Sequence, residues 1–512
     1  MDMDTDVVVV GAGPVGLLLG CELKLAGAHP LIVERLAAPD PTVKAGSVNV
    51  ASARALDRRG LLPQLQAAQE QLLAQVREFI RQQGGGDGGG ATRLPRFAAH
   101  FGGITIDGTR IDTDDPALAD LGPAGEVLAV SQQAVEAMLA AWAAELGVEV
   151  RRGVTVTGFE QDEEGVTVRL AGGDELRTGW LVGADGGRST VRKLAGFAFP
   201  GTDPEITGHQ AMVDLEGGEK LGRGWQATDT GVFVNGPMPG RILTVQFDGP
   251  PADRDAPITA EELTAALRRV TGEDVTVTAV RSATRFTDNA RLAEDYRRGR
   301  VLLAGDAAHV HSPFGGQGLN LGLGDAANLG WKLAAVVRGT APDGLLDSYT
   351  AERRPVAAQV LDWTRAQVAL MRPRPYERAL RSVVADLLAG TDGSTHMARK
   401  LSGVLQRIGP ADGHPLVGSA APELFLADGS RLADHFHTGG GLLLRLSPQA
   451  PDVEGYADRV RTVTASCPGR PGTAALLVRP DGFVVWASDL ADGTADGLSE
   501  ALTTWFGAPA AA

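Results

Sequence analysis

The sequence predicts a mixed α/β fold organised around a parallel β-sheet. Residues 5–34 form the pattern of a buried strand, a glycine turn, an apolar helix and a second apolar strand, which together make one βαβ unit. Another short buried strand at 301–305 precedes an apolar helix over 319–338. Residues 148–183 alternate apolar and polar side chains, and residues 205–285 add further β-like segments.

The remaining segments follow the same rules. Helices are expected over 64–80, 131–147 and 259–271, where apolar or alanine-rich patterns have helical spacing. The glycine-rich run 84–90 is expected to be a mobile surface loop. A Pro/Arg-rich stretch at 372–375 precedes a helical region that extends to about 408, and a new unit with mixed strand and helix signals begins at His414.

The composition is that of a soluble globular protein, with 43% apolar and 22% charged residues among 512. Its 63 acidic and 48 basic residues give a net charge of −15, which disfavours nucleic acid and anionic membranes as partners. Two cysteines, Cys21 and Cys467, provide neither a disulfide framework nor a cysteine-rich metal site. The acidic N-terminus and the absence of a long apolar run favour a cytoplasmic protein.

The first motif is Gly11-x-Gly13-x-x-Gly16, placed between the first strand and the first helix. In such a turn the glycines permit a tight bend, a close approach of the backbone to a pyrophosphate and close packing of helix on strand. Glu34 ends the second strand, where a carboxylate can accept hydrogen bonds from a ribose. We therefore expect a Rossmann-like dinucleotide-binding unit, although this motif alone does not separate FAD from NAD.

Two further motifs place an acid after a strand. Asp185-Gly186 follows strand residues 180–182, and Asp185 could order the turn as a cap or reach a nucleotide. Asp306 follows the strand at 301–305, in position to hold a polyol or ribose hydroxyl. The glycine-rich loop 315–320 then presents backbone N–H groups at a helix start, a nest that stabilises negative charge.

The pair His309 and His311 invites a metal hypothesis. No third ligand is evident in the sequence, and the pair lies inside the motif that begins at Gly305. We therefore expect no metal, and interpret the histidines as hydrogen-bonded structural groups or as a source of local polarity or of a proton.

These three motifs, in this order and spacing across residues 5–375, resemble the signatures of class A flavoprotein aromatic hydroxylases. The segments 100–104, 305–309, 317–320, 328–333 and 346–353 are most similar to aromatic polyketide hydroxylases of the angucycline and anthracycline type. The segment from His414 resembles that family's thioredoxin-like C-terminal domain, but Cys467 stands alone, so dithiol chemistry is not expected there.

The resemblance implies a glutathione-reductase-like FAD-binding domain, a β-sheet substrate domain and a thioredoxin-like domain. The FAD domain is expected in three pieces, residues 1–65, 125–195 and 285–375. The substrate domain is expected at 95–124 and 196–284, a helical linker at 376–410 and the thioredoxin-like domain at 411–512. The stretch 65–95 is longer than the family pattern, and we interpret it either as a cover of the substrate entrance or as an inert surface helix.

The resemblance also assigns cofactor positions. The pyrophosphate would lie over Gly13, the adenosine ribose on Glu34 and the ribityl chain on Asp306. The full set that the resemblance implies is Gly11, Gly13, Pro14, Val15, Gly16, Glu34, Arg35, Lys44, Gln132, Asp185, Asp306, Pro313, Gly315, Gly318, Leu319 and Asn320. Lys44 departs from the family, which usually has arginine there, and lysine lacks the bidentate fork.

The implied reaction is NAD(P)H-dependent hydroxylation of a polycyclic aromatic polyketide by O2 through a C4a-hydroperoxyflavin. The flavin carries the chemistry, so no catalytic side chain is required; Pro313 is expected near it. Candidate pocket walls are Phe101, Ile104, Trp225, Phe233 and Phe247, although each could equally be core packing.

Three alternatives stay open at this point: Baeyer–Villiger oxygenation of a ketone by the same flavin, flavin-dependent antibiotic inactivation, and a non-catalytic FAD-binding scaffold. The resemblance leaves the choice between monomer and homodimer open, and also that between NADPH and NADH.

Overall fold

The computed structural model describes residues 3–82, 96–97, 99–236, 238, 240–409, 413–490 and 495–510. Its main sheet has the order β16-β17-β8-β1-β2-β5, and its five strands from β17 to β5 run parallel. The strands are β1 (Thr5–Val10), β2 (Pro30–Glu34), β5 (Glu149–Arg152), β8 (Glu175–Gly183), β16 (Arg297–Arg298) and β17 (Val301–Leu303), with β6 (Val156–Gln161) and β7 (Val166–Leu170) forming an antiparallel extension beside β8. The predicted α/β fold with a parallel sheet is confirmed.

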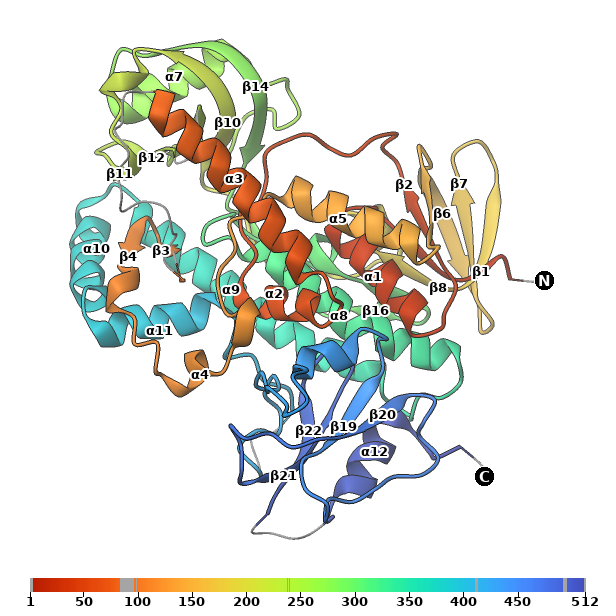
Figure 1. Ribbon diagram of the computed structural model, residues 1–512. Coiled ribbons are helices and arrows are strands. Elements are labelled where there is room, and N and C mark those ends of the chain that lie inside the picture. The colour runs from red at the N-terminus through yellow and green to blue at the C-terminus, as the bar shows by residue number, and fades with distance from the viewer. Residues whose placement is uncertain are drawn as a thin grey trace.

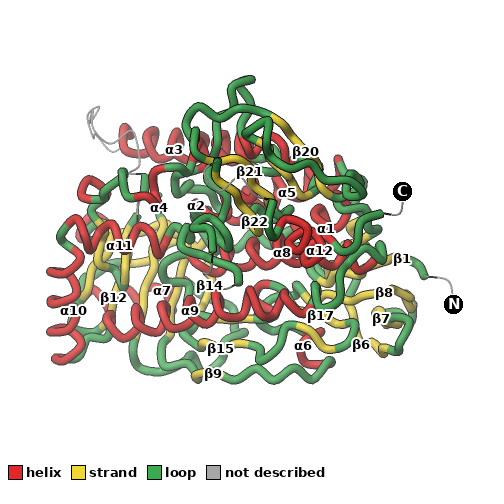
Figure 2. Tube along the Cα trace, turned by 90° about the horizontal axis from the view of Figure 1, so that it is seen from below, coloured by secondary structure: helices red, strands yellow, loops and turns green. Residues whose placement is uncertain are grey.

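Apolar helices cover this sheet and explain the apolar runs of the sequence (Figure 1). Helix α1 (Pro14–Leu25) packs between α5 (Gln132–Glu145) and α8 (Gln317–Val337), and its Leu17, Leu19 and Leu23 are fully buried against the sheet. Helix α9 (Asp347–Met371) extends from the main sheet to α10 (Pro375–Leu388), as Figure 2 shows. The helices predicted over 131–147 and 319–338 are thus confirmed within two residues at each end.

The second sheet is antiparallel and has the order β11-β12-β13-β10-β14. Its strands are β10 (Thr207–Glu216), β11 (Gly224–Ala227), β12 (Gly231–Asn235), β13 (Arg241–Gln246) and β14 (Thr276–Phe286). Helix α7 (Ala260–Thr271) covers one face, where it buries Leu263 and Leu267 against Ala211 and Val213. The other face turns toward the main sheet. The contact that shows this is the hydrogen bond from the side-chain amide of Gln210 of β10 to the carbonyl of Lys44, in the loop that follows β2.

A hairpin of β3 (Ala99–Phe101) and β4 (Ile104–Ile106) packs against helices α10 and α11 (Thr391–Leu401). Phe101 and Ile106 of the hairpin share a buried cluster with Leu370 of α9 and Met397 of α11. The region expected as a helical linker is therefore helical, and α11 contributes to a core of its own. Helix α3 (Leu62–Gln82) confirms the predicted amphipathic helix, whereas the glycine run 84–90 lies outside the described residues.

The C-terminal unit has a four-stranded sheet of order β20-β19-β21-β22 and one closing helix. These elements are β19 (Gly441–Arg445), β20 (Val460–Thr464), β21 (Thr473–Val478), β22 (Val484–Asp489) and α12 (Leu498–Phe506). The shorter elements of the chain are α2 (Val50–Asp57), α4 (Pro116–Ala119), α6 (Thr190–Leu194), β9 (Gly201–Thr202), β15 (Ala290–Leu292) and β18 (His309–Val310).

Buried charges join the C-terminal unit to the rest of the chain. Arg479 donates to Glu352 of α9 at 2.8 and 2.9 Å, and Lys332 of α8 donates to the same carboxylate at 2.9 Å. Arg59 forms a second buried pair with Glu22 of α1, with two N–H···O distances of 2.7 Å, and also donates to the Phe436 carbonyl. Breaking such pairs on one side is costly, so they hold the unit in one orientation. No helix in the described part of the chain is long and apolar enough to cross a bilayer.

Candidate functional site

The candidate site lies where the parallel strands β1, β8 and β17 end, which is where open α/β sheets bind ligands. Gly11 has φ +110°, and a Cβ there would lie 2.4 Å from the Ala184 carbonyl oxygen. A Cβ on Gly16 would lie 1.9 Å from the Gly11 oxygen, so helix and turn touch directly. A Cβ on Gly13 would meet nothing within 4 Å, which leaves open space in front of this turn.

That open space faces the beginning of α1. Gly13 is the N-cap of α1 and supplies no side-chain cap, and Pro14 occupies the first turn. The first N–H groups of the helix therefore lack a side-chain acceptor, and the positive end of the helix dipole points outward. This arrangement fits a diphosphate.

Glu34, at the end of β2, organises the same turn. Its carboxylate accepts the Ala12 N–H and the Leu36 N–H, each at 2.8 Å. Each oxygen keeps a second acceptor site, which is what a ribose diol requires. The neighbouring Arg35 is exposed and pairs with no described residue.

Asp306 lies in a 3-10 turn directly after β17 and is exposed, with no hydrogen bond to the described residues. The turn itself is held from below, because the Gly305 N–H donates to Asp325 at 3.0 Å. A carboxylate that the fold leaves free at this strand end fits the expected role of holding a polyol.

Asp325 of α8 is a residue that the sequence motifs missed. Its fully buried carboxylate accepts His309 Nε2 at 2.7 Å and Arg353 Nε at 2.8 Å, in addition to the Gly305 N–H. Burial alone would raise the pKa of Asp325, but the charges and hydrogen bonds of His309 and Arg353 lower it below its usual value. An acid inside a mostly apolar helix was the available signal, since such an acid needs buried partners.

The second helix start at this site is that of α8. Gly315 and Gly316 both have positive φ, 81° and 63°, and Gly316 is an N-cap without a side-chain acceptor. Asn320 anchors the loop, because its Oδ1 accepts the Asn49 N–H at 2.8 Å and its Nδ2 donates to the Gly316 carbonyl at 2.8 Å. The N–H groups around Gly318 and Leu319 begin a helix without a side-chain cap, an arrangement that fits the expected nest for negative charge, and Pro313 is exposed in the same loop.

Asp185 uses its carboxylate locally. It accepts the Ser189 hydroxyl and the backbone N–H groups of Thr190 and Val191 at 2.5, 2.6 and 3.2 Å, so it orders the start of α6 as a cap. Arg188, in the same segment, forms an exposed pair with Asp255. Of the two interpretations of this motif, the structure supports the turn-ordering one.

Lys44 and Gln132 lie on the loop and helix that border the site. The Lys44 ammonium forms an ion pair with Asp40 at 2.8 Å. Against the effect of burial, hydrogen bonds from Lys44 and Thr42 lower the pKa of Asp40 to about 2. Gln132 donates its backbone N–H to Ala45 at 2.9 Å, and its side-chain amide has no partner among the described residues.

Aromatic side chains extend from the α8 loop to the second sheet. The Trp225 ring lies 6.3 Å from Phe314 and 4.1 Å from His100, measured between ring centroids. Phe247 packs partly buried in the same cluster as Phe314. These rings line the side of the second sheet that faces the main sheet.

Two expected wall residues are placed elsewhere. Phe233 lies on the opposite face of its sheet, packed against α7, so the expectation that it lines the pocket is wrong. Strand alternation predicted two faces without saying which of them turns to the main sheet. Phe101 packs on Trp363, with ring centroids 4.6 Å apart. Both belong to the hairpin cluster, which also contains Ile106 of β4, the strand that begins at Ile104.

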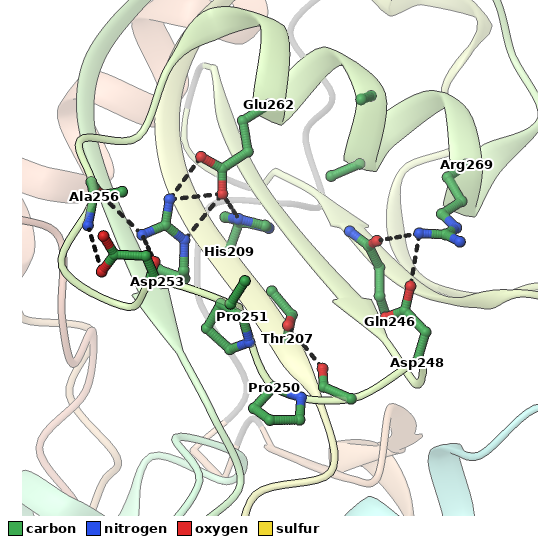
Figure 3. A pocket seen from close by; sticks show the side chains of 15 residues that line it. Thr207, His209, Gln246, Asp248, Pro250, Pro251, Asp253, Ala256, Glu262 and Arg269 are labelled. Carbon is green, nitrogen blue, oxygen red and sulfur yellow. Dashed lines mark hydrogen bonds and ion pairs between the residues drawn. The ribbon is translucent and has the colours of Figure 1, made fainter.

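A cavity of about 510 Å³ lies beneath α7, away from the site (Figure 3). Its charged groups satisfy one another, since Glu262 accepts Arg285 at 2.6 Å and His209 at 2.7 Å. Because His209 points to the α7 face of β10 while Gln210 points to Lys44, this cavity and the candidate site are on opposite faces of the sheet. We therefore do not assign the cavity to the reaction.

Metal binding finds no support in the described residues, which hold no cluster of three or more His, Cys, Asp or Glu side chains suited to it. His309 is engaged by Asp325, and His311 Nδ1 lies 2.8 Å from the Ser312 carbonyl oxygen.

Comparison with known proteins agrees with this geometry. Residues 4–364 match the model of an FAD binding domain, and residues 414–509 match that of an aromatic-ring hydroxylase C-terminal region. The chain is 43% identical to 12-dehydrotetracycline 5-monooxygenase/anhydrotetracycline 6-monooxygenase of Streptomyces rimosus, over 99% of this chain and all of that protein. It is 40% identical to a rifampicin monooxygenase of Streptomyces venezuelae, over 99% of each.

A solved structure gives the same result in three dimensions. The anhydrotetracycline hydroxylase OxyS from Streptomyces rimosus superposes with a TM-score of 0.84 at 41% identity, covering 99% of this chain and all of that one. Sequence identity at this level over the whole length, together with both family matches, establishes the relationship. The chain belongs to the FAD-dependent aromatic-ring hydroxylases, a family of flavoprotein monooxygenases.

Proposed function

We propose that this enzyme hydroxylates a polycyclic aromatic polyketide, using FAD, O2 and NADPH or NADH, in the biosynthesis of an antibiotic or related secondary metabolite. The observation that carries the proposal is the convergence of two uncapped helix starts and the free Asp306 carboxylate at one sheet edge. The relative that acts in tetracycline oxidation supports the substrate class.

FAD would supply the redox chemistry and the activation of oxygen. The turn at Gly13 and the start of α1 would bind its diphosphate, Glu34 its adenosine ribose and Asp306 its ribityl chain. The N–H groups at the start of α8, held by Asn320, would stabilise negative charge on the reduced ring system. Each of these roles uses a group that the fold leaves unpaired or with acceptor sites free.

The protein must also keep water from the reacting oxygen and hold the aromatic ring near it. Gln367 ties the two sides of the site together, because its Oε1 accepts the Gly102 N–H at 3.0 Å and its Nε2 donates to the Phe314 carbonyl at 3.2 Å. This contact holds the hairpin with His100 against the α8 loop. The half-buried ring of Trp225, which the buried Phe314 contacts edge-on, then offers an apolar surface against which a flat substrate can stack.

The expected domain organisation fits this function and stays part of the proposal: a discontinuous, Rossmann-like FAD domain, a substrate domain on the second sheet and a thioredoxin-like C-terminal domain. The last would act in structure rather than redox chemistry, since Cys467 is buried and unpaired. We keep a cytoplasmic location as a prediction, and the choice between monomer and homodimer stays open.

Antibiotic inactivation is the second candidate, which the rifampicin monooxygenase among the relatives favours. Baeyer–Villiger oxygenation uses the same site, and the geometry does not separate it from hydroxylation.

The test is to purify the protein, record its bound flavin, and incubate it with NADPH or NADH, O2 and a panel of aromatic polyketides. We expect substrate-stimulated oxidation of the nicotinamide and a product that gains one oxygen atom with its ring skeleton retained. A lactone product would assign Baeyer–Villiger chemistry, and loss of antibacterial potency of a fed antibiotic would assign inactivation. A protein that takes up no FAD would refute the proposal.

A further inference from the structure

Three basic side chains gather on the face of the second sheet that turns to the main sheet. Arg241 begins β13 and pairs in register with Met212, on the same face as Gln210. His100 comes from the β3–β4 hairpin and stacks on Trp225. Arg381 of α10 reaches the hairpin and donates to the Gly102 carbonyl.

None of the three has an acidic partner among the described residues. The Arg241 side chain makes no hydrogen bond or ion pair with these residues, and its Nε is shielded from solvent without an acceptor. Arg381 has only the Gly102 carbonyl. By contrast, the buried arginines Arg59, Arg353 and Arg479 all have carboxylate acceptors.

The directions of the pKa shifts in this cluster agree with the lack of acidic partners. Burial lowers the pKa of Arg241 and of Arg381. Burial, followed by the charges of these two arginines, lowers the pKa of His100 to about 4, so the imidazole is neutral at neutral pH. Since His100 Nδ1 accepts the Gly103 N–H at 3.3 Å, the proton of the neutral ring resides on Nε2, which is free to donate.

The cluster is connected to the flavin side of the site. The Trp225 ring lies between His100, at 4.1 Å, and Phe314, at 6.3 Å, and Phe314 directly precedes the Gly315-Gly316 turn at the start of α8. A flat aromatic body lying along the half-buried Trp225 ring would therefore have one end toward the α8 loop and the other at the basic cluster.

We propose that Arg241, Arg381 and His100 form an anion subsite that binds a carboxylate or ionised enol of the aromatic substrate. This inference rests on the proposed function and narrows its substrate class to polycyclic aromatics that carry an acidic oxygen at the end remote from the flavin. Arg241 supplies the unpaired charge, Arg381 a second one, and the His100 Nε2–H a neutral donor.

A structural role for Arg241 and a role in anion binding predict opposite effects on protein stability when the guanidinium is removed. A guanidinium that holds the fold together stabilises it, whereas a buried charge without a partner destabilises the ligand-free protein and is compensated only when an anion binds. Replacing Arg241 by methionine, which has a similar length but no charge, distinguishes the structural role from the anion-binding role.

The binding test uses the FAD-loaded enzyme and two probes that differ only in charge: a dihydroxyanthraquinone carboxylate and its methyl ester. Dissociation constants are measured by quenching of tryptophan fluorescence. We expect the wild type to bind the carboxylate about 10- to 100-fold more tightly than the ester, the range of a charge-assisted buried hydrogen bond. Arg241→Met should remove most of this preference without weakening the ester, and Arg241→Lys should retain part of it.

Arg269→Met is the matched control, because Arg269 is an exposed arginine of the same sheet domain that pairs with Asp248 on the α7 face. It should leave the preference unchanged. A wild type that does not prefer the carboxylate, including one that fails to bind it, would overturn the subsite. Equal weakening of both probes by Arg241→Met would do so as well.

The second measurement needs no probe. The unfolding midpoint of the ligand-free holoenzyme should rise by about 1–3 °C in Arg241→Met, and a fall would show that Arg241 is structural and overturn the proposal. FAD content is recorded for every variant. Retained FAD with no anion preference refutes the subsite alone, whereas loss of FAD from the wild type refutes the proposed function.

Discussion

Replacing Asp325 by asparagine tests how the flavin site is held in place. The wild-type carboxylate is fully buried and serves three donors: His309 Nε2, Arg353 Nε and the Gly305 N–H, at 2.7, 2.8 and 3.0 Å. Asparagine has nearly the same shape, but it lacks the charge and brings an NH2 group that faces one of these donors. The change therefore leaves the Arg353 guanidinium, only 5% exposed, without its counter-ion.

The magnitude follows from that burial. Removing one partner of a buried ion pair typically costs about 3–5 kcal/mol, because the remaining charge stays desolvated. Since Asp325 also anchors the turn that carries Asp306, FAD affinity should fall together with stability. We expect both effects in Asp325→Asn, with the loss of unfolding free energy in the range of about 3–5 kcal/mol.

The assay is urea unfolding of apoprotein and holoenzyme followed by tryptophan and flavin fluorescence, with FAD binding titrated on the apoprotein. Asp255→Asn is the control, because Asp255 and Arg188 form a pair whose side chains are 72% and 60% exposed and should contribute little. If Asp325→Asn unfolded like the control and bound FAD like the wild type, the account of Asp325 as the anchor of this turn would be refuted.

Three further predictions concern the cofactor turn and the domain junction. Gly16→Ala should destabilise the apoprotein, because the new Cβ would lie 1.9 Å from the Gly11 oxygen. Gly13→Ala should leave apoprotein stability unchanged and weaken FAD binding. Thermal unfolding and FAD titration check both variants, and equal behaviour of the two would contradict the geometry. Asp306→Ala should weaken FAD binding without changing apoprotein stability, because the exposed Asp306 side chain makes no hydrogen bond or ion pair with the described residues. A drop in the unfolding midpoint of the apoprotein would speak against this. Burial alone would raise the pKa of Glu352, but hydrogen bonds and charges from Arg479 and Lys332 lower it from 4.5 to about 2. The ionised Glu352 therefore contributes about 3 kcal/mol to the free energy of unfolding. This contribution is complete above about pH 5 and is lost as the pH falls toward 2. Urea unfolding between pH 7 and pH 3 should therefore be less pH-dependent in Glu352→Gln than in the wild type, and identical slopes would disprove the assignment.

The sequence alone determined the features that depend on neighbouring residues. The strand, glycine turn and helix at 5–25 follow from a run of valines, from three glycines at fixed spacing and from leucines of helical period, all of which act within a few residues. The same holds for the acid after β17 and the glycine nest before α8. The family resemblance added the cofactor and the reaction type to this local pattern.

Only the tertiary structure decided which distant side chains meet. Nothing local relates Asp325 to His309 and Arg353, and the chain had to fold before these three could share one buried carboxylate. Strand alternation likewise could not say that Phe233 faces α7 while Arg241 faces the main sheet, because alternation defines two faces and the packing of α7 selects between them. Local patterns specify backbone conformation and burial, whereas long-range packing decides which charges are paired and which are left free for a ligand.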